Sequence, residues 1–191
     1  MVRFLLGVVL GIVLAPLAVL GWFRFGQPPV AVSDPPLPFE RQIVNVPMQA
    51  RIKREMISTS PVQPDENDLV AGAQVYSDQC SSCHGFYGKP SSFAAHMYPR
   101  APQLWQKHRR GTGVGVSDDP AGETAWKVDN GIRLTGMPAF KQMLSDTQIW
   151  QVSVLLANAD KPLPPAALDI LRGQQTPPQA TAAPAKKAKK P

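Results

Sequence analysis

Two cysteines three residues apart, followed directly by a histidine, constrain this chain more than any other feature of its sequence. The motif is Cys80-Ser81-Ser82-Cys83-His84, and it holds both cysteines of the 191 residues. A C-x-x-C-H run is typical of c-type haem attachment, because two thiols on one helical turn can each reach a porphyrin vinyl group while the histidine binds the iron. We therefore predict one covalently bound haem c, held by Cys80, Cys83 and His84.

A disulfide, a C-x-x-C redox pair and half of a zinc site are the alternatives for the two cysteines. Redox motifs of the thioredoxin kind lie near a βαβ pattern, which this sequence lacks. A zinc site needs two further ligands at short spacing, and none accompanies the motif. Haem attachment is therefore the preferred interpretation.

An uncharged stretch of twenty residues, Phe4 to Phe23, lies between Arg3 and Arg24. A helix of that length spans ~30 Å, the thickness of a bilayer's hydrocarbon core, whereas the core of a signal peptide has about 7–15 residues. We expect residues 1–25 to form a single transmembrane anchor, with a cleaved leader as the alternative. The flanking charges are too evenly divided to decide its orientation.

Residues 26–65 are rich in proline, which fixes φ and removes a backbone hydrogen-bond donor. We expect a tether without long helices. Within it, Met48, Ile52 and Met56 recur at helical spacing beside basic residues, which indicates a short basic amphipathic helix. Such a helix could contact anionic headgroups or a partner, but a short helix packed on the following domain, or plain linker, is the simpler interpretation.

Residues 66–163 carry the patterns of a small helical domain. One helix is expected to begin after capping residues at Asp65 and to run into the haem motif. An irregular loop is expected over 86–119, a helix over 121–130, and a last helix that starts at Ser145 with a capping-box pattern. So long a loop in so small a domain suggests a chain wrapped round a large cofactor.

Residues 164–191 are mostly alanine, proline and lysine, and we expect a disordered basic tail. The formal net charge of the chain is +6, yet residues 66–160 hold eight Lys/Arg and nine Asp/Glu. The basic excess therefore belongs to the tether and the tail. A solubilising role is the simplest explanation, contact with anionic lipid or an acidic partner is the alternative, and nucleic-acid binding has no support.

Haem iron accepts a second axial ligand, and five side chains after the motif could supply it: Met97, Met137, Met143, His96 and His108. Met137 is preferred because it lies between Gly136, which allows close backbone approach to a ring, and Pro138, which stiffens the loop. Met143 is more in keeping with packing, and the two histidines with exposed positions in a polar loop.

Several motifs in this order resemble a bacterial membrane-anchored monohaem class I cytochrome c. They are the haem motif, Ala101-Pro102-Gln103-Leu104, Asn130-Gly131-Ile132, Gly136-Met137-Pro138-Ala139-Phe140 and a C-terminal helix bearing a tryptophan. The resemblance covers residues 66–160. It implies an all-α, class I cytochrome c-like domain wrapped round the haem, preceded by the transmembrane helix and the Pro-rich tether.

The resemblance also implies contacts within that domain. The first and last helices should cross, with Gly72 and Tyr76 against Trp150 and its neighbours. The carbonyl of Pro102 should accept a hydrogen bond from the second ring nitrogen of His84. Arg100 or Arg133 could pair with a haem propionate, or be solvated surface charges.

His84 and Met137 as axial ligands would leave no open iron position, which indicates an electron-transfer protein and not an enzyme. We expect a carrier that shuttles electrons between membrane-associated respiratory or dehydrogenase complexes, without a small-molecule substrate. Bacterial c-type haem is attached outside the cytoplasmic membrane, so the resemblance places the haem domain on the periplasmic side of the inner membrane. A fixed cytochrome c subunit of a membrane oxidoreductase, and a haem enzyme or gas sensor with open iron, are the alternatives.

Overall fold

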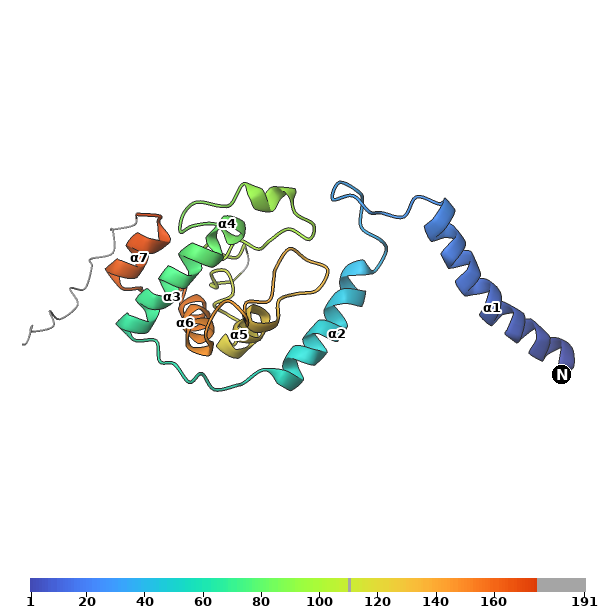
Figure 1. The fold of residues 1–191 in the computed structure, drawn as a ribbon, viewed down its shortest axis with the longest axis horizontal. Coiled ribbons are helices and arrows are strands. Elements are labelled where there is room, and N and C mark those ends of the chain that lie inside the picture. Colours follow the sequence, from blue (N-terminus) through green and yellow to red (C-terminus); the bar gives the residue numbers. More distant parts are fainter. Residues whose placement is uncertain (110, 175–191) are drawn as a thin grey trace, which may run out of the picture. The chain divides into compact units, whose positions relative to one another are not determined.

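The computed structural model describes residues 1–109 and 111–174. Its helices, in chain order, are α1 (Val2–Phe25), α2 (Glu40–Glu55), α3 (Glu66–Gln79), α4 (Ser81–His84), the 3₁₀ helix η1 (Phe93–His96), α5 (Ala121–Asn130), α6 (Asp146–Ala157) and α7 (Pro165–Leu171) (Figure 1). Extended pairing within the described residues is limited to two isolated bridges. The expected all-α fold is confirmed.

The described chain divides into two compact units, Met1–Val46 and a second unit that starts at Pro47. In the first unit, α1 has a mean hydropathy of 2.7 over its most apolar window, and none of its residues is buried. A helix of 24 residues with this composition is long enough to cross a membrane. The structure thus fits the expected anchor.

Helix α2 differs from the expected proline-rich tether, because it is a single helix of 16 residues with Pro47 inside it. Proline removes one hydrogen bond from a helix interior. Two features offset that loss: the Glu40 carboxylate accepts a hydrogen bond from the backbone N–H of Leu37 at 2.8 Å, and Ile52 is only 1% exposed. The packed-helix interpretation holds for the second half of α2, and the second unit starts at Pro47 instead of residue 66.

Helices α3 and α6 cross where Gly72 meets α6, as expected. A Cβ on Gly72 would overlap the backbone of Gln151 and press on Cβ of Leu155. The amide of Gln151 also donates a hydrogen bond to Asp68 at 2.8 Å. On α6, the residues closest to Gly72 are therefore Gln151 and Leu155, which are neighbours of the predicted Trp150.

Helix ends follow the predicted capping residues. Asp65 accepts a hydrogen bond from the Asp68 backbone N–H at 2.9 Å, and Ser145 and Gln148 form the complete capping box of α6. Gly131 ends α5 with φ at +66°, a conformation that L side chains rarely adopt. The described residues of segment 86–119 are irregular as expected, apart from η1 and two isolated bridges, Phe86–Lys89 and Lys107–Val114.

Helix α7 contradicts the expectation that disorder begins at residue 164. It packs against α3, and its Ala167 and Leu171 are completely buried (Figure 1). The carbonyl of Leu171 also accepts a hydrogen bond from the Tyr87 backbone N–H at 2.9 Å. The composition of the segment does not reveal this helix of 7 residues, because two buried apolar side chains suffice to fix so short a helix on an existing core. The rest of the predicted tail, 175–191, lies outside the described residues.

Candidate haem site

The two cysteines lie on one helical turn at the junction of α3 and α4. The carbonyl of Cys80 accepts hydrogen bonds from the backbone N–H groups of Cys83, at 3.2 Å, and His84, at 2.9 Å. Both thiols are free, and both line one cavity together with the His84 side chain. The pentapeptide therefore presents its three functional side chains to the same space.

The thiol of Cys80 does not have the properties of a redox catalyst. Burial, and in second place the neighbouring Cys83 thiol, raises the pKa of Cys80 to about 12. Catalytic C-x-x-C pairs depend on a thiol whose pKa is lowered, since the thiolate is the nucleophile. The geometry thus disfavours the redox alternative.

The imidazole of His84 is oriented by the expected hydrogen bond to the Pro102 carbonyl. Nδ1 of His84 lies 2.7 Å from that oxygen, so the tautomer that satisfies the contact carries its proton on Nδ1 and leaves Nε2 as a free acceptor. Burial lowers the pKa of His84, and the contact with Pro102 raises it in part. A neutral imidazole with one free nitrogen is the form that binds a metal.

The backbone that follows His84 is fixed from two sides. The buried hydroxyl of Tyr76 donates a hydrogen bond to the Gly85 carbonyl at 2.6 Å, and burial raises the pKa of Tyr76, so the hydroxyl keeps its proton. Trp105 packs edge-on against the Tyr76 ring, with centroids 5.4 Å apart. Gly85 itself has φ at +80°, and a Cβ there would collide with the Gln103 amide. These contacts hold the haem motif in one position.

Met137, the expected second ligand, lines the same cavity as Cys80, Cys83 and His84. The cavity has a volume of about 250 Å³ and lies between α3, α4, α5, α6 and the loops around residues 97–104 and 132–140. Its apolar walls include Leu104, Val128, Ile132, Phe140, Val152 and Leu156. The structure therefore gathers all five residues of the predicted site, Pro102 included, around one space.

The residues around this cavity fit a haem c. Cys80 and Cys83 offer two thiols for attachment, while His84 and Met137 offer an imidazole nitrogen and a thioether sulfur, a recurrent axial pair in haem proteins. The apolar walls suit the faces of a porphyrin ring. The geometry alone, however, could serve any ligand of this shape, so the comparison with known proteins is decisive.

A family model described as "Cytochrome C oxidase, cbb3-type, subunit III" matches residues 67–156. Residues 67–156 are a cytochrome c domain. The match runs from the first turn of α3 to the last turn of α6 and so includes the whole haem motif and Met137. Together with α1, this domain gives the chain the organisation of a membrane-anchored monohaem cytochrome c. No curated protein and no solved structure matches the chain.

The lining of the haem cavity includes Met48, Thr124 and Lys127, which the sequence did not assign to the site, and Met97, one of the five ligand candidates. Met48 comes from α2, which lies outside the matched domain. Its helical spacing with Ile52 was visible in the sequence, but spacing shows only that two residues share a face, and not what that face contacts.

The basic residues near the haem cavity divide into two groups. Arg100 lines the cavity, whereas Arg133 is exposed and lies outside its lining. Lys127 also lines it, but its ammonium pairs with Glu123 at 2.7 Å and with Asp119 at 3.6 Å. Both arginines that could pair with a propionate are exposed, and Arg100 is the one that lines the cavity.

The remaining ligand candidates lie away from the haem cavity. His96 and His108 are exposed, and Nε2 of His108 lies 2.8 Å from the Gly115 carbonyl. Met143 is 58% exposed, so the expectation that it packs in the interior is wrong.

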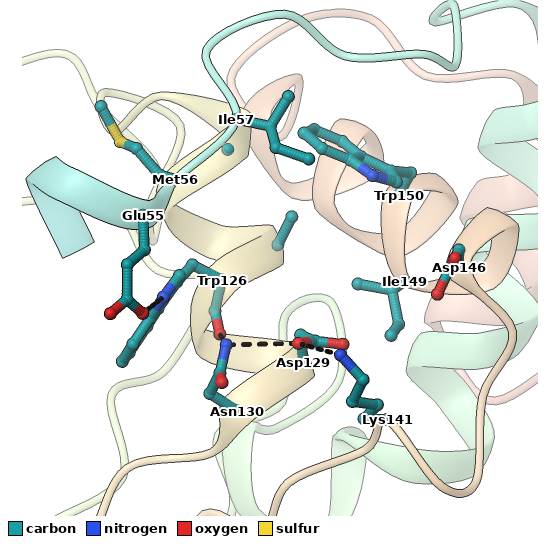
Figure 2. Close-up of a pocket in the computed structure, with 12 residues that line it drawn as sticks. Glu55, Met56, Ile57, Trp126, Asp129, Asn130, Lys141, Asp146, Ile149 and Trp150 are labelled. Atoms are coloured by element: carbon teal, nitrogen blue, oxygen red, sulfur yellow. Dashed lines mark hydrogen bonds and ion pairs between the residues drawn. The ribbon is translucent and has the colours of Figure 1, made fainter. Parts of the chain in front are cut away.

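A second cavity, of about 260 Å³, lies where the end of α2 meets α5 and α6 (Figure 2). Trp126 and Trp150 line it, with Glu55 hydrogen-bonded to Trp126 at its edge. The ammonium of Lys141 pairs with Asp129 at 3.5 Å. Glu55 and Lys141 thus each have a partner within the protein. The contact between Glu55 and Trp126 attaches the end of α2 to the cytochrome c domain.

Proposed function

We propose that this protein is a one-electron carrier that exchanges electrons between membrane-associated respiratory or dehydrogenase complexes. The observation that supports it best is the shared cavity of Cys80, Cys83, His84 and Met137. Two thiols, an imidazole from the end of α4 and a thioether from the loop of Met137 are the groups that a six-coordinate haem c requires. The family match supports electron transfer as the general activity.

A haem c in this site supplies a reversible one-electron couple. The protein contributes the fixed orientation of the His84 imidazole through Pro102, a thioether ligand in Met137, and apolar walls that exclude water. Methionine ligation favours the reduced state and raises the reduction potential. If His84 and Met137 both bound the iron, the site would have no place for a substrate, which is why we propose a carrier and not an enzyme.

We further propose that α1 holds the protein in the inner membrane with the haem domain on the periplasmic side. The support is the apolar helix, together with the extracytoplasmic attachment of bacterial c-type haem. Spheroplasts expose the periplasmic face of the inner membrane, so protease added to them should digest the haem domain. If the domain were digested only after lysis of the inner membrane, the haem domain would lie on the cytoplasmic side and the proposed orientation would be wrong.

The purified full-length protein tests the carrier proposal. Denaturing electrophoresis followed by haem staining should show haem bound to the polypeptide, and Cys80→Ser with Cys83→Ser should abolish the stain. A redox titration should fit a single one-electron step, and the reduced protein should not bind carbon monoxide. High-spin iron or ready carbon monoxide binding would instead support the enzyme or sensor alternative.

A fixed subunit of a membrane oxidoreductase is the second candidate, and two observations favour it. The matched family is named for a subunit of a cbb3-type oxidase. In addition, the packed second half of α2 leaves only residues 26–39 as linker between α1 and α2. That segment reaches at most ~50 Å when fully extended, which limits how far the haem domain can travel.

Mild detergent extraction followed by native electrophoresis separates the two candidates. A free carrier should migrate as a single small species, and its haem stain should not coincide with any oxidase or dehydrogenase activity. Comigration with a large catalytic assembly, stable to ion-exchange chromatography, would identify a fixed subunit.

A further inference from the structure

The haem cavity contains a second thioether near the loop of Met137. Met97 follows directly after η1, is half-buried, and lines the same cavity as Met137. Its terminal methyl lies against Gly136, the residue just before Met137, so closely that a Cβ on Gly136 would overlap it. Among the described residues, no other heavy atom beyond the chain neighbours lies within 4 Å of that Cβ position.

The loop that carries Met137 is held mainly by its own hydrogen bonds. The Thr135 hydroxyl donates to the Ile132 carbonyl at 2.7 Å and accepts from the Met137 backbone N–H at 3.1 Å. The Met137 carbonyl accepts from the Ile132 backbone N–H at 3.2 Å. The turn is thus closed internally, while Leu134 at its tip is 82% exposed. Such a loop can move as one piece unless a neighbour holds it.

Met97 is fixed, through η1, to the opposite side of the cavity. The backbone N–H of Ser91 donates to the Gln103 side chain at 2.6 Å, and the Gln103 amide donates to the Cys83 carbonyl at 3.2 Å. The Ser91 hydroxyl donates to the Ser82 carbonyl. The segment before Met97 is therefore attached to the haem motif itself, so Met97 connects that motif to the Met137 loop.

We propose that Met97 is a positioning residue for Met137: its methyl, packed on Gly136, holds the loop so that the thioether stays on the iron. This inference rests on Met137 being the second axial ligand, as proposed above. A packing contact of this kind restricts a loop because an empty space beside it allows alternative positions. A side chain at position 136 would displace the Met97 methyl from this place.

Imidazole binding to the oxidised full-length holoprotein measures how often the Met137 sulfur leaves the iron. Met97→Ala should raise the rate of imidazole binding about tenfold, because the loop loses a packing contact and the barrier to its movement falls by about 1.4 kcal/mol. Met97→Leu, which keeps the volume, should stay within about twofold of the wild type. Met143→Ala, on an exposed methionine, is the matched control and should have no effect. Equal rates for Met97→Ala and the wild type would overturn the proposal.

A double-mutant cycle tests the contact with Gly136. Gly136→Ala should also raise the rate, because the new methyl displaces Met97. If the two residues act through one contact, the double variant should be no faster than the faster single variant. Multiplicative effects on the rate would contradict the proposal.

The sulfur-to-iron absorption band distinguishes failure of this inference from failure of the carrier proposal. A wild type without the band would refute Met137 ligation, and with it both proposals. A band lost in Met97→Ala but kept in Met137→Ala would make Met97 the ligand and overturn its positioning role. A band lost in Met137→Ala and kept in Met97→Ala, together with the faster imidazole binding, is the expected result.

Discussion

Glu55, at the end of α2, accepts a hydrogen bond at 3.0 Å from Nε1 of Trp126 in α5, 71 residues later in the chain (Figure 2). Arg51 adds a second contact, because its guanidinium lies over the Trp126 ring at 5.8 Å while it pairs with Glu55 at 2.8 Å. Ile52, between them, is buried. A segment that precedes the matched cytochrome c domain is thus part of its packed structure.

Replacement of Ile52 by alanine should release the second half of α2 from the domain. The loss of a buried isoleucine costs about 2–5 kcal/mol, which exceeds what the surface contacts of α2 can compensate. Trypsin should then cleave at Arg51, Lys53 or Arg54 at least tenfold faster than in the wild type. Ile43→Ala is the control on the same helix, since Ile43 is 68% exposed, and it should leave the cleavage rate unchanged.

The attachment of α2 should weaken in acid. The hydrogen bond from Trp126, and next the one from Arg51, holds the pKa of Glu55 below its usual value of 4.5. A lowered pKa means that the carboxylate stabilises the folded state above about pH 4.5 and that this contribution is lost as the pH falls through the lowered pKa.

Thermal unfolding of the wild type and Glu55→Gln across this pH range tests that expectation. The wild type should have the higher midpoint at pH 7, and the difference should vanish at acid pH. Trp126→Phe, which keeps an aromatic ring but removes the indole N–H donor, should show a difference from the wild type that becomes smaller at acid pH. A difference that persisted below the lowered pKa would mean that Glu55 acts through something other than its charge.

Met137→Ala should open the iron of the holoprotein. The variant should lose the long-wavelength sulfur-to-iron band of the oxidised form, bind carbon monoxide when reduced, and have a lower reduction potential. Optical spectra and a redox titration measure all three. Haem staining after denaturing electrophoresis should be retained, because attachment depends on Cys80 and Cys83, and loss of the stain would point to a folding defect instead.

Gly72→Ala should destabilise the protein although it improves helix propensity. Alanine is favoured over glycine in a helix interior by ~1 kcal/mol, but the added methyl would overlap the Gln151 backbone of α6. Overpacking of this kind costs about 1–3 kcal/mol, so we expect the midpoint of thermal unfolding to fall. Gln74→Ala, on the exposed face of α3, should change it little. A rise in the midpoint for Gly72→Ala would show that the two helices can separate at no cost.

The haem site was predictable because its parts are local. Cys80, Cys83 and His84 lie within five consecutive residues, and Met137 stands between a glycine and a proline that favour close approach to a ring. Helix boundaries at Asp65 and Ser145 were predictable for the same reason, since a cap depends on residues three positions away.

The roles of α2 and α7 were not predictable in this way. Proline suggested a tether at Pro47, and low complexity suggested disorder after residue 164, yet Ile52, Ala167 and Leu171 are buried. Burial depends on partners that are far away in the sequence, such as α5 for α2 and α3 for α7, and a local pattern does not identify them.

The sequence by itself determined that this chain carries a haem motif, an apolar helix and a candidate axial methionine in Met137, because thiol spacing, hydropathy and turn chemistry act over a few residues. Only the tertiary structure decided which methionines lie close together. Met48, Met97 and Met137 line one cavity, while Met143 is exposed to solvent. The physical reason is that a cavity is enclosed by segments that fold from every part of the chain, so its lining is a property of packing.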